Sequence, residues 1–424
     1  MDALRARVLG QIDEGACVAL IKKLVPAGQP AAENPADPDM PSGREEAFAL
    51  TVADELRHMG LSVRMTETVI GRPNVMARLA GSTGSPRLIL NDHLDTYPAG
   101  DPAEWDRTNF DPYNPTVIDR AIYGRGTSDT RGNMACQLTA VKAILKAGVK
   151  LEGDLQFVYT IDEERNGYSG ARYLTKEGLV EGDYCIVSEP TSWTTPDDWG
   201  IDIAVAHAGH CLLEVETGGT KAHIWRPETG INAINHMVTL LQRLEGLELT
   251  HGKPQLYGST RPGLCVVKVA GGRPGETGFT PNRCIARLVA VGLVPGMTPR
   301  GIIDDIRAVI EGVQSEDPTF EAEVRQLPGY TFIPGTEEIP EEAPPVRAIA
   351  GAYREITGKE PRYYRKNGYC DTIQFNLQGI PAITFGPGED AWSPVNEYIN
   401  IDKVLVATQV YACAIMDLLG VAGE

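Results

Sequence analysis

The sequence predicts an α/β protein in which a large central sheet flanked by helices is interrupted by a smaller α+β domain. Up to residue 201, short continuous apolar runs alternate with stretches of helical periodicity, which is the pattern of a sheet covered on both faces. Residues 202–328 follow another order, strand–helix–strand–strand–helix–strand, which is typical of a two-layer, ferredoxin-like domain. From residue 329 the first pattern resumes, so the smaller domain is inserted into the larger one.

The larger domain is predicted to begin with two helices. Apolar residues at helical spacing predict a helix over 2–24, and a second helix over 44–60 ends at Gly60, because glycine commonly closes helices. The strands that follow are predicted at 74–81, 87–95, 154–162 and 183–189. The helices between them are predicted at 132–148 and 168–178.

The inserted part is predicted to open with one long strand over 201–219. Its other elements are a helix at 229–246, strands at 264–272 and 283–294, a helix at 298–314 and a strand at 320–327. The larger domain is then completed by a helix at 344–358, a strand at 381–388 and an amphipathic helix at 402–419. We therefore predict one domain from 1–201 and 329–424, and another from 202–328.

Composition and charge exclude several classes of function. The 424 residues exceed what one compact core usually holds, and their formal net charge is −18. Lysine and arginine form no basic patch, so nucleic acid and anionic membranes are poor partners. We find no signal peptide and no membrane span. The eight cysteines are scattered without a CxxC pair, which predicts reduced thiols in a cytoplasmic protein.

Polar side chains that can bind metal follow the predicted strands. His93 and Asp95 end one of them, and their spacing of two places both on one face of the strand end. Ligands of open α/β sheets bind at the carboxyl ends of strands, where a histidine can ligate a metal while a nearby aspartate holds its other ring nitrogen. A polar turn after a buried strand contains the same residues, so this pair alone leaves both interpretations open.

Further carboxylates occupy similar places. Asp129 lies in a Gly-rich turn just before a predicted helix, where an N-cap is its ordinary role. Glu163 and Glu164 follow the end of an apolar strand, where adjacent carboxylates repel unless a cation compensates, and Glu189 ends another strand. Each of these fits a solvated loop when taken singly. Together with a histidine at the same sheet edge, they form a ligand set that suits divalent zinc, manganese or cobalt.

Four motifs, HLDT, GRGTSDTRG, the DEE triplet and SEPT, resemble in order and spacing those of the M20 metallopeptidase and amidohydrolase family. The likeness extends over nearly the whole chain, and TKAHIWRPETGINAI resembles the family's lid motif. The resemblance implies a catalytic metal-binding domain from 1–201 and 329–424, and a lid and dimerisation domain from 202–328. It also implies a homodimer or a higher homo-oligomer that assembles through the lid.

The resemblance assigns the metal ligands residue by residue. His93, Asp129 and Glu189 would ligate one divalent ion, and Asp95 would orient His93. Asp129 would be able to bridge to a second ion, of which Glu164 would be a ligand.

The resemblance also assigns two residues to the reaction itself. Glu163 would be the general base that activates the attacking water. His223 would stabilise the oxyanion by reaching into the active site of a partner subunit. A position on the lid surface, without a role in catalysis, is the alternative for His223.

One departure from the family pattern concerns the second metal ion. The family's remaining ligand is a histidine a few residues after GPG, where this chain has Trp392 or Ser393, and all seven histidines lie at or before His251. We therefore predict one well-defined divalent ion in each active site. Glu389 or Asp390 could substitute for the missing ligand, although a polar loop is their ordinary role.

A second departure concerns the lid. Family members often carry Asp-x-Arg before a VPG-like turn, and the arginine can hold a substrate carboxylate. Here Ala290 and Gly292 occupy those places. The candidate replacements are Arg226, Arg273, Arg283 and Tyr369.

These features predict a hydrolase that cleaves a C–N bond of a small molecule. Two substrate classes stay open: N-acyl amino acids and small peptides, which are ordinary for the family, and an aromatic amine such as 5-nitroanthranilate. Loss of the arginine, a single metal ion and an aromatic wall at Trp392 would suit the second class. A catalytically inactive binding relative is a third alternative, but the presence of Asp95 and Glu163 argues against it.

Overall fold

The computed structural model describes residues 3–258, 261–273, 275–389 and 395–423. The chain divides into two compact units. The first contains Met1–Val205, Ile339–Tyr364 and Cys370–Glu424, and the second contains Ala206–Glu338 and Arg365–Tyr369.

The first unit is built on an eight-stranded sheet with the order β1-β2-β6-β3-β7-β17-β10-β16. The strands are β1 (Ser62–Val69), β2 (Arg72–Leu79), β3 (Arg87–His93), β6 (Asp154–Thr160), β7 (Tyr184–Val187), β10 (Ile203–His207), β16 (Tyr363–Lys366) and β17 (Ala382–Thr384). β6, β3, β7 and β17 are parallel neighbours. Their carboxyl ends therefore meet at one edge of the sheet.

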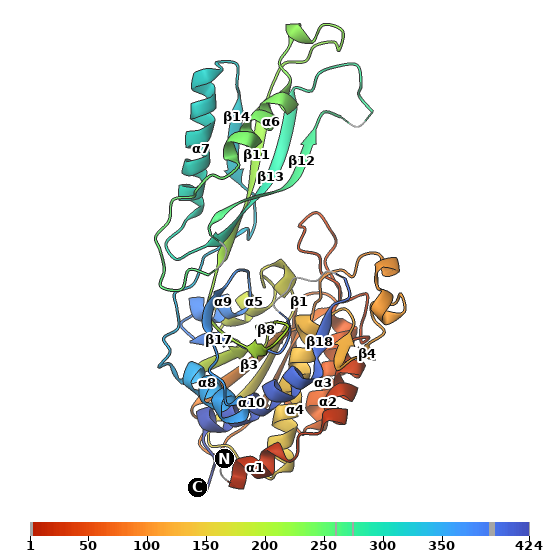
Figure 1. The fold of residues 1–424 in the computed structure, drawn as a ribbon, viewed down its shortest axis with the longest axis vertical. Helices are drawn as coiled ribbons and strands as arrows, with labels where there is room; N and C mark the ends of the chain where they lie inside the picture. The colour runs from red at the N-terminus through yellow and green to blue at the C-terminus, as the bar shows by residue number, and fades with distance from the viewer. Residues whose placement is uncertain (1–2, 259–260, 274, 390–394, 424) are drawn as a thin grey trace. The chain divides into compact units, whose positions relative to one another are not determined.

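Helices cover both faces of this sheet, as the sequence predicts. They are α1 (Ala3–Leu9), α2 (Glu14–Leu24), α3 (Glu46–His58), α4 (Gly132–Lys146), α5 (Ala171–Lys176), α8 (Pro344–Thr357), α9 (Thr372–Leu377) and α10 (Ile401–Leu419). α10 lies between α4 and α8 on one side, and α5 and α9 pack together on the other (Figure 1). Leu174 of α5 and Phe375 of α9 join an apolar cluster with residues of β3, β6 and β7.

Two small sheets of short strands complete the first unit. β4 (Thr116–Ile118), β5 (Ala121–Tyr123) and β18 (Tyr398–Asn400) form a three-stranded sheet, and β8 (Ser192–Thr194) pairs with β9 (Trp199–Ile201). Because β5 and β18 are paired, the turn that precedes α4 lies next to the segment that follows residue 395.

The second unit has the predicted order of a ferredoxin-like domain. Its elements are β11 (Gly209–Gly218), α6 (Ala233–Leu244), β12 (Gly263–Gly271), β13 (Arg283–Leu293), α7 (Pro299–Glu316), β14 (Ala322–Gln326) and the short β15 (Phe332–Ile333), which pairs with β11. The sheet order is β12-β13-β11-β14, and its paired strands are antiparallel. α6 and α7 cover one face through a core that includes Leu213, Met237 and Ile306.

Two elements that were predicted to be continuous are each divided into two in the structure. The helix predicted over 2–24 is two helices, because the Asp13 carboxylate accepts a hydrogen bond from Ala16 N at 2.7 Å and begins α2 anew. The long strand predicted over 201–219 is two strands in different sheets, β10 in the large sheet and β11 in the small one. In each stretch the apolar residues continue on both sides of the interruption, so periodicity alone does not reveal it.

Most of the cysteines belong to the protein's core. All eight cysteines are free thiols, and seven of them are buried, with Cys265 exposed. Within the described ranges, we find no helix with both the length and the apolarity that crossing a membrane requires.

Candidate metal centre

The parallel strands bring the predicted site residues to one edge of the large sheet. His93 is the last residue of β3, Glu189 follows β7, and Glu163 follows β6. β3 lies between β6 and β7 in the sheet. Three positions that are far apart in the sequence therefore lie beside one another at the carboxyl ends of the strands, where open α/β sheets bind ligands.

His93, Asp129 and Glu189 form one compact group of metal-binding side chains. His93 Nε2 lies 2.9 Å from Asp129 Oδ1 and 3.2 Å from Glu189 Oε1, and the three donor atoms lie within 4.8 Å of one another. His93 and Glu189 are buried, and Asp129 is half-buried. One imidazole and two carboxylates facing one another out of water fit a divalent transition metal, which would compensate the two negative charges.

The orientation of His93 is fixed from its other side. Nδ1 lies 2.9 Å from the backbone oxygen of Asp95 and 3.4 Å from its carboxylate Oδ1. An N–H at Nδ1 can therefore donate to Asp95, which leaves the lone pair of Nε2 directed at Asp129 and Glu189. The geometry suits the role that the sequence analysis gives Asp95.

A buried carboxylate holds the loop that carries Asp129. Glu397 accepts hydrogen bonds from the backbone N–H groups of Gly126, Ser128 and Asp129 at 2.8, 2.7 and 2.9 Å. It also pairs with Arg125 at 2.8 Å. Backbone groups that point at a single carboxylate leave the loop little freedom, so Glu397 fixes the position of Asp129.

The N-cap interpretation of Asp129 is wrong. α4 begins at Gly132, and the residue before its first turn is Arg131. Asp129 lies two residues further upstream, with φ −124° and ψ 86°, outside the helical region. Its carboxylate contacts His93 and belongs to the metal-binding group.

Glu163 and Glu164 are carried by a tight turn after β6. Asp162 has a left-handed backbone with φ 69°, and the Asp95 carboxylate accepts hydrogen bonds from the N–H groups of Glu163 and Glu164, both at 3.2 Å. Asp95 therefore contacts His93 and the turn at the same time. The same side chain links the histidine to the two glutamates that follow Asp162.

The carboxylate of Glu163 is buried and makes no hydrogen bond or ion pair with another described residue. Only 7% of the residue is exposed. Burial, followed by the negative charge of Glu189, raises the pKa of Glu163 well above its usual value. Burial and the charge of Asp129 raise the pKa of Glu164 in the same way, but neither metal-binding group of described residues includes Glu164.

Beneath the turn lies a charged network that the sequence analysis missed. Arg72 donates hydrogen bonds to Glu45 at 2.6 and 2.8 Å and to Asp162 at 3.1 Å. Asn34 donates to Asp95 at 2.8 Å and to Asp162 at 3.2 Å. All five side chains are buried. No motif marks Asn34, Glu45 or Arg72, because only the fold brings them to Asp162.

A second group of potential ligands contains a cysteine. Donor atoms of Glu163, Glu189 and Cys370 also lie within 4.8 Å of one another, and all three residues are buried. Cys370 lies between β16 and α9, far from the other motifs in the sequence. Its only signal in the sequence is its place in the stretch NGYCDT, which resembles a family motif.

The proposed substitutes for the missing histidine divide into two cases. Glu389 is bonded to Lys403 and accepts a hydrogen bond from Thr194 Oγ1 at 2.9 Å, and it belongs to neither metal-binding group. Asp390, Trp392 and Ser393 lie outside the described residues. The carboxylate of Glu389 is thus engaged in an ion pair with Lys403.

The second unit presents His223 on an exposed loop. Its ring lies edge-on to Trp225 and Phe279, at centroid distances of 5.8 and 5.5 Å. At the two places of the family's Asp-x-Arg, Ala290 is fully buried and Gly292 has a left-handed backbone with φ 69°. Neither place offers a cation to a substrate carboxylate.

Among the candidate replacements for that arginine, two are engaged within the second unit. Arg283 pairs with Glu216 at 2.5 Å on the sheet, and Arg226 lies 3.4 Å from Glu228. Each pair partly satisfies the charge of its arginine.

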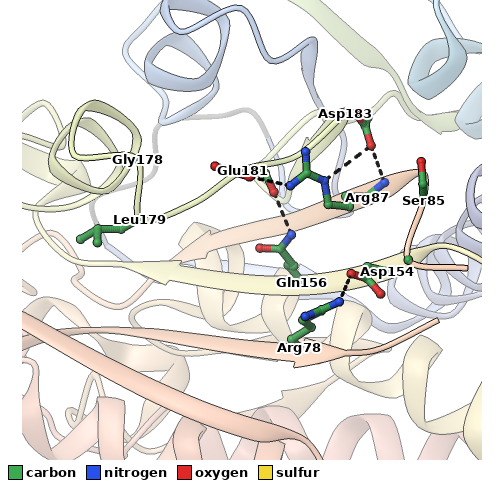
Figure 2. A pocket seen from close by; sticks show the side chains of 10 residues that line it. Arg78, Ser85, Arg87, Asp154, Gln156, Gly178, Leu179, Glu181 and Asp183 are labelled. Carbon is green, nitrogen blue, oxygen red and sulfur yellow. Dashed lines mark hydrogen bonds and ion pairs between the residues drawn. The ribbon is translucent and has the colours of Figure 1, made fainter. Parts of the chain in front are cut away.

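A hollow in the first unit lies at the opposite end of the strands. It is lined by Arg78, Arg87, Asp154 and Glu181 among others, at the beginning of β3 and β6 (Figure 2). Its arginines already face carboxylates, with Arg87 2.7 Å from Glu181 and Arg78 paired with Asp154. It contains neither metal-binding group, so the candidate chemistry belongs to the carboxyl ends of the strands.

Comparison with known proteins agrees with this location. Residues 89–417 match the description peptidase family M20/M25/M40. The chain is 29% identical over 370 residues to succinyl-diaminopimelate desuccinylase of Gluconacetobacter diazotrophicus, covering 85% of this chain and 89% of the relative. It is 28% identical over 360 residues to acetylornithine deacetylase of Myxococcus xanthus, covering 81% and 85%.

Solved structures share the fold. Human carnosine dipeptidase 1 superposes with a TM-score of 0.76 at 19% identity, covering 99% of both chains. A tripeptidase of Staphylococcus aureus superposes with a TM-score of 0.72 at 21% identity, covering 96% of this chain and all of the other. The family match spans both compact units and every residue of the two metal-binding groups. The chain therefore belongs to peptidase family M20/M25/M40 and is a metal-dependent hydrolase of C–N bonds.

Proposed function

We propose that the protein hydrolyses the amide bond of a small N-acyl amino acid or peptide, with Glu163 as the general base. The observation that carries this proposal is the buried Glu163 carboxylate, which has no hydrogen-bond or ion-pair partner among the described residues and lies beside Glu189. A base must be available to a water molecule rather than occupied by the protein. The two relatives named as a desuccinylase and a deacetylase support an amide substrate.

His93, Asp129 and Glu189 would hold one divalent ion, zinc, manganese or cobalt. When bound, such an ion supplies Lewis-acid polarisation at the reacting centre. Glu163 accepts a proton from the attacking water as the water oxygen bonds to the acyl carbon. The C–N bond then breaks, and Glu163 returns the proton to the leaving nitrogen. Asp95 keeps the Nε2 side of His93 turned toward the ion throughout.

The test of this assignment is E163Q, which removes the base and keeps the shape of the side chain. We expect turnover to be abolished while the bound metal, measured by elemental analysis, stays at one equivalent of Mn²⁺. E164Q is the matched control on the next residue, and it should keep part of the activity. Retained turnover in E163Q would remove Glu163 as the base.

An aromatic amine is the second candidate substrate, favoured by the surroundings of His223. Trp225 and Phe279 give the loop of His223 aromatic faces. In this case water would displace an amino group from an activated ring. A panel of N-acyl amino acids, dipeptides and nitroanthranilates separates the two, since each class releases a different product.

We further propose that the protein is a homodimer assembled through the second unit. β12 is an edge strand, and Val266, Val267 and Val269 on it are 46%, 58% and 50% exposed. Val238 of α6 is also 50% exposed. An apolar edge strand is a template for pairing with another chain. V267E should yield monomers in light scattering, whereas a dimer of unchanged stability would argue against this surface.

His223 would act across that dimer, stabilising the oxyanion in the partner's active site. Mixing two inactive dimers tests this directly, because a heterodimer of E163Q and H223A would contain one site with both groups intact. We expect activity to return after subunit exchange. If His223 serves its own subunit, the mixture stays inactive.

The cytoplasmic location remains a prediction from the reduced cysteines.

A further inference from the structure

We propose that Glu163, Glu189 and Cys370 form a second cation site, selective for a thiophilic divalent ion such as Zn²⁺ or Cd²⁺, and that its occupancy switches the enzyme off. The site is distinct from the family's second metal position, which would use Asp129 and Glu164. It shares Glu189 with the first metal-binding group.

The distances permit an ion to be held. The three donor atoms lie within 4.8 Å of one another. Around a tetrahedral zinc ion, a sulfur and an oxygen ligand are separated by about 3.5 Å, given Zn–S and Zn–O bonds of about 2.3 and 2.1 Å. The three side chains therefore need to close by about 1 Å, which small rotations about their side-chain bonds supply.

The Glu163 carboxylate supplies an independent reason to expect a ligand here. It is nine-tenths buried, and among the described residues it has no hydrogen-bond or ion-pair partner. The other two members of its group are a carboxylate and a thiol, neither of which can compensate a negative charge, and His93 would be a neutral ligand of the first ion. A buried charge without a counter-charge is costly, and a cation at this point removes the cost.

The thiol gives the site its selectivity. Cys370 is fully buried, and its sulfur lies 3.1 Å from Thr372 Oγ1 and 3.6 Å from Thr384 Oγ1. The two hydroxyls lie 2.6 Å apart, so one of them donates to the other and the second can donate to a thiolate, which helps to hold it as a ligand. Thiolates favour zinc and cadmium over manganese and magnesium, which prefer oxygen. Manganese would therefore occupy the first group and leave this one to a softer ion.

Charge balance favours both ions together. Asp129 and Glu189 neutralise one divalent ion, and Glu163 with the Cys370 thiolate neutralises another. The thiol proton is released to solvent when the ion binds. Occupancy would be inhibitory because a ligated Glu163 can no longer accept a proton from water. This consequence rests on the proposed role of Glu163, whereas the binding itself does not.

The test is a titration of the Mn²⁺-loaded protein with Cd²⁺, following the ultraviolet charge-transfer absorption of a cadmium thiolate. A C265S background removes the exposed thiol, which would bind cadmium by itself. We expect one thiolate band per chain, which C370S abolishes. C185S is the matched control, because Cys185 is equally buried in the same apolar cluster and lies outside the group.

A band that persists in C370S, or no band in the C265S protein, would overturn the site. If C370S does not fold by circular dichroism, C370A repeats the measurement. Excess Zn²⁺ should inhibit turnover of the C265S protein, and C370S should raise the inhibitory concentration at least about tenfold. If no substrate of the panel is turned over, the proposed function fails while the cadmium titration still decides the site.

Discussion

Arg72 donates a hydrogen bond of 3.1 Å to Asp162, the residue whose left-handed backbone turns the chain from β6 into Glu163. Two other nitrogens of the same guanidinium, Nε and Nη2, donate hydrogen bonds to the carboxylate of Glu45. Arg72 and Glu45 are 3% and 0% exposed, so neither charge is compensated by water. A buried ion pair of this kind contributes little stability by itself, but breaking one side of it leaves an uncompensated charge.

We predict that R72M lowers kcat by about 10- to 100-fold, because a base displaced by a fraction of an ångström loses its alignment with the reacting water. Metal content should not change, since Arg72 contacts none of His93, Asp129 and Glu189. R72K should recover part of the lost kcat, because lysine keeps the positive charge but lacks the several N–H donors of the planar guanidinium. Steady-state kinetics with elemental analysis on the same samples measures both quantities.

Two further variants separate positioning from stability. R78M removes the other arginine of β2, an exposed side chain whose partner Asp154 lies at the opposite end of the strands, and it should keep wild-type kcat. E45Q–R72M removes both members of the Glu45–Arg72 ion pair, so that only Asp162 loses its contact with the guanidinium. A wild-type kcat in that double variant would mean that the network serves stability alone.

The second prediction concerns Glu397, whose two oxygens hold three backbone N–H groups around Asp129. A glutamine keeps one acceptor oxygen and replaces the other with a donor, so it opposes one of these N–H groups. We expect E397Q to weaken Mn²⁺ affinity by about 10- to 100-fold, as loss of a group that orients a ligand typically does. Equilibrium titration of the metal-free protein gives the affinity.

E389Q is the matched control for this measurement. Glu389 is also a partly buried carboxylate at the same end of the chain, but it is tied to Lys403 and Thr194. Its variant should bind Mn²⁺ as the wild type does and lose stability instead. Equal Mn²⁺ affinities of E397Q and the wild type would show that the Asp129 loop holds its shape without Glu397.

The sequence predicted the parts of the site that are carried by motifs. His93, Asp129 and Glu189 lie within 4.8 Å of one another, and their role as metal ligands stays a prediction. Parallel strands bring His93 and Glu189 to one edge of the sheet, which needs only the order of the strands. Arg72, Asn34 and Cys370 were missed because they reach the site through packing between distant segments. The interpretation of Asp129 as an N-cap was wrong because the capping preference of aspartate before a helix competes here with a tertiary contact to His93.

The same limit applies to the fold. The strand–helix order of the second unit was sufficient to predict its ferredoxin-like topology. The break between β10 and β11 was missed, since Ile203–His207 and Gly209–Gly218 both have the residue pattern of a strand and only their partners differ. The break between α1 and α2 depends on one capping side chain, Asp13. Periodicity predicts what an element is more reliably than where it ends.

The third prediction concerns metal removal. Without an ion, the carboxylates of Asp129 and Glu189 face each other around His93, and binding of an ion to the folded state alone adds stability. At a free Mn²⁺ concentration one hundred times the dissociation constant, the gain should be about 2.7 kcal/mol. H93Q should lose this gain, and E163Q should keep it. Thermal unfolding with and without chelator measures it; a full gain in H93Q would place the ion elsewhere.

The last prediction concerns His207, the last residue of β10. Burial, together with the positive charges of Lys366 and Arg365, lowers the pKa of His207 to about 3. In the unfolded chain a histidine has a pKa of about 6.5. Between pH 6.5 and pH 3, roughly, His207 is protonated in the unfolded state and neutral in the folded state. The stability contributed by this residue is therefore present at pH 7 and is lost as pH falls.

From pH 7 to pH 5 this loss amounts to about 2 kcal/mol for one histidine. H207Q cannot take up the proton, so its free energy of unfolding should fall by that much less over the same interval. The difference between the two pH values is the quantity to compare, because any packing cost of the glutamine is present at both. Denaturant unfolding of wild type and variant at pH 7 and pH 5 measures it. Identical differences would mean that the folded protein admits a charged His207.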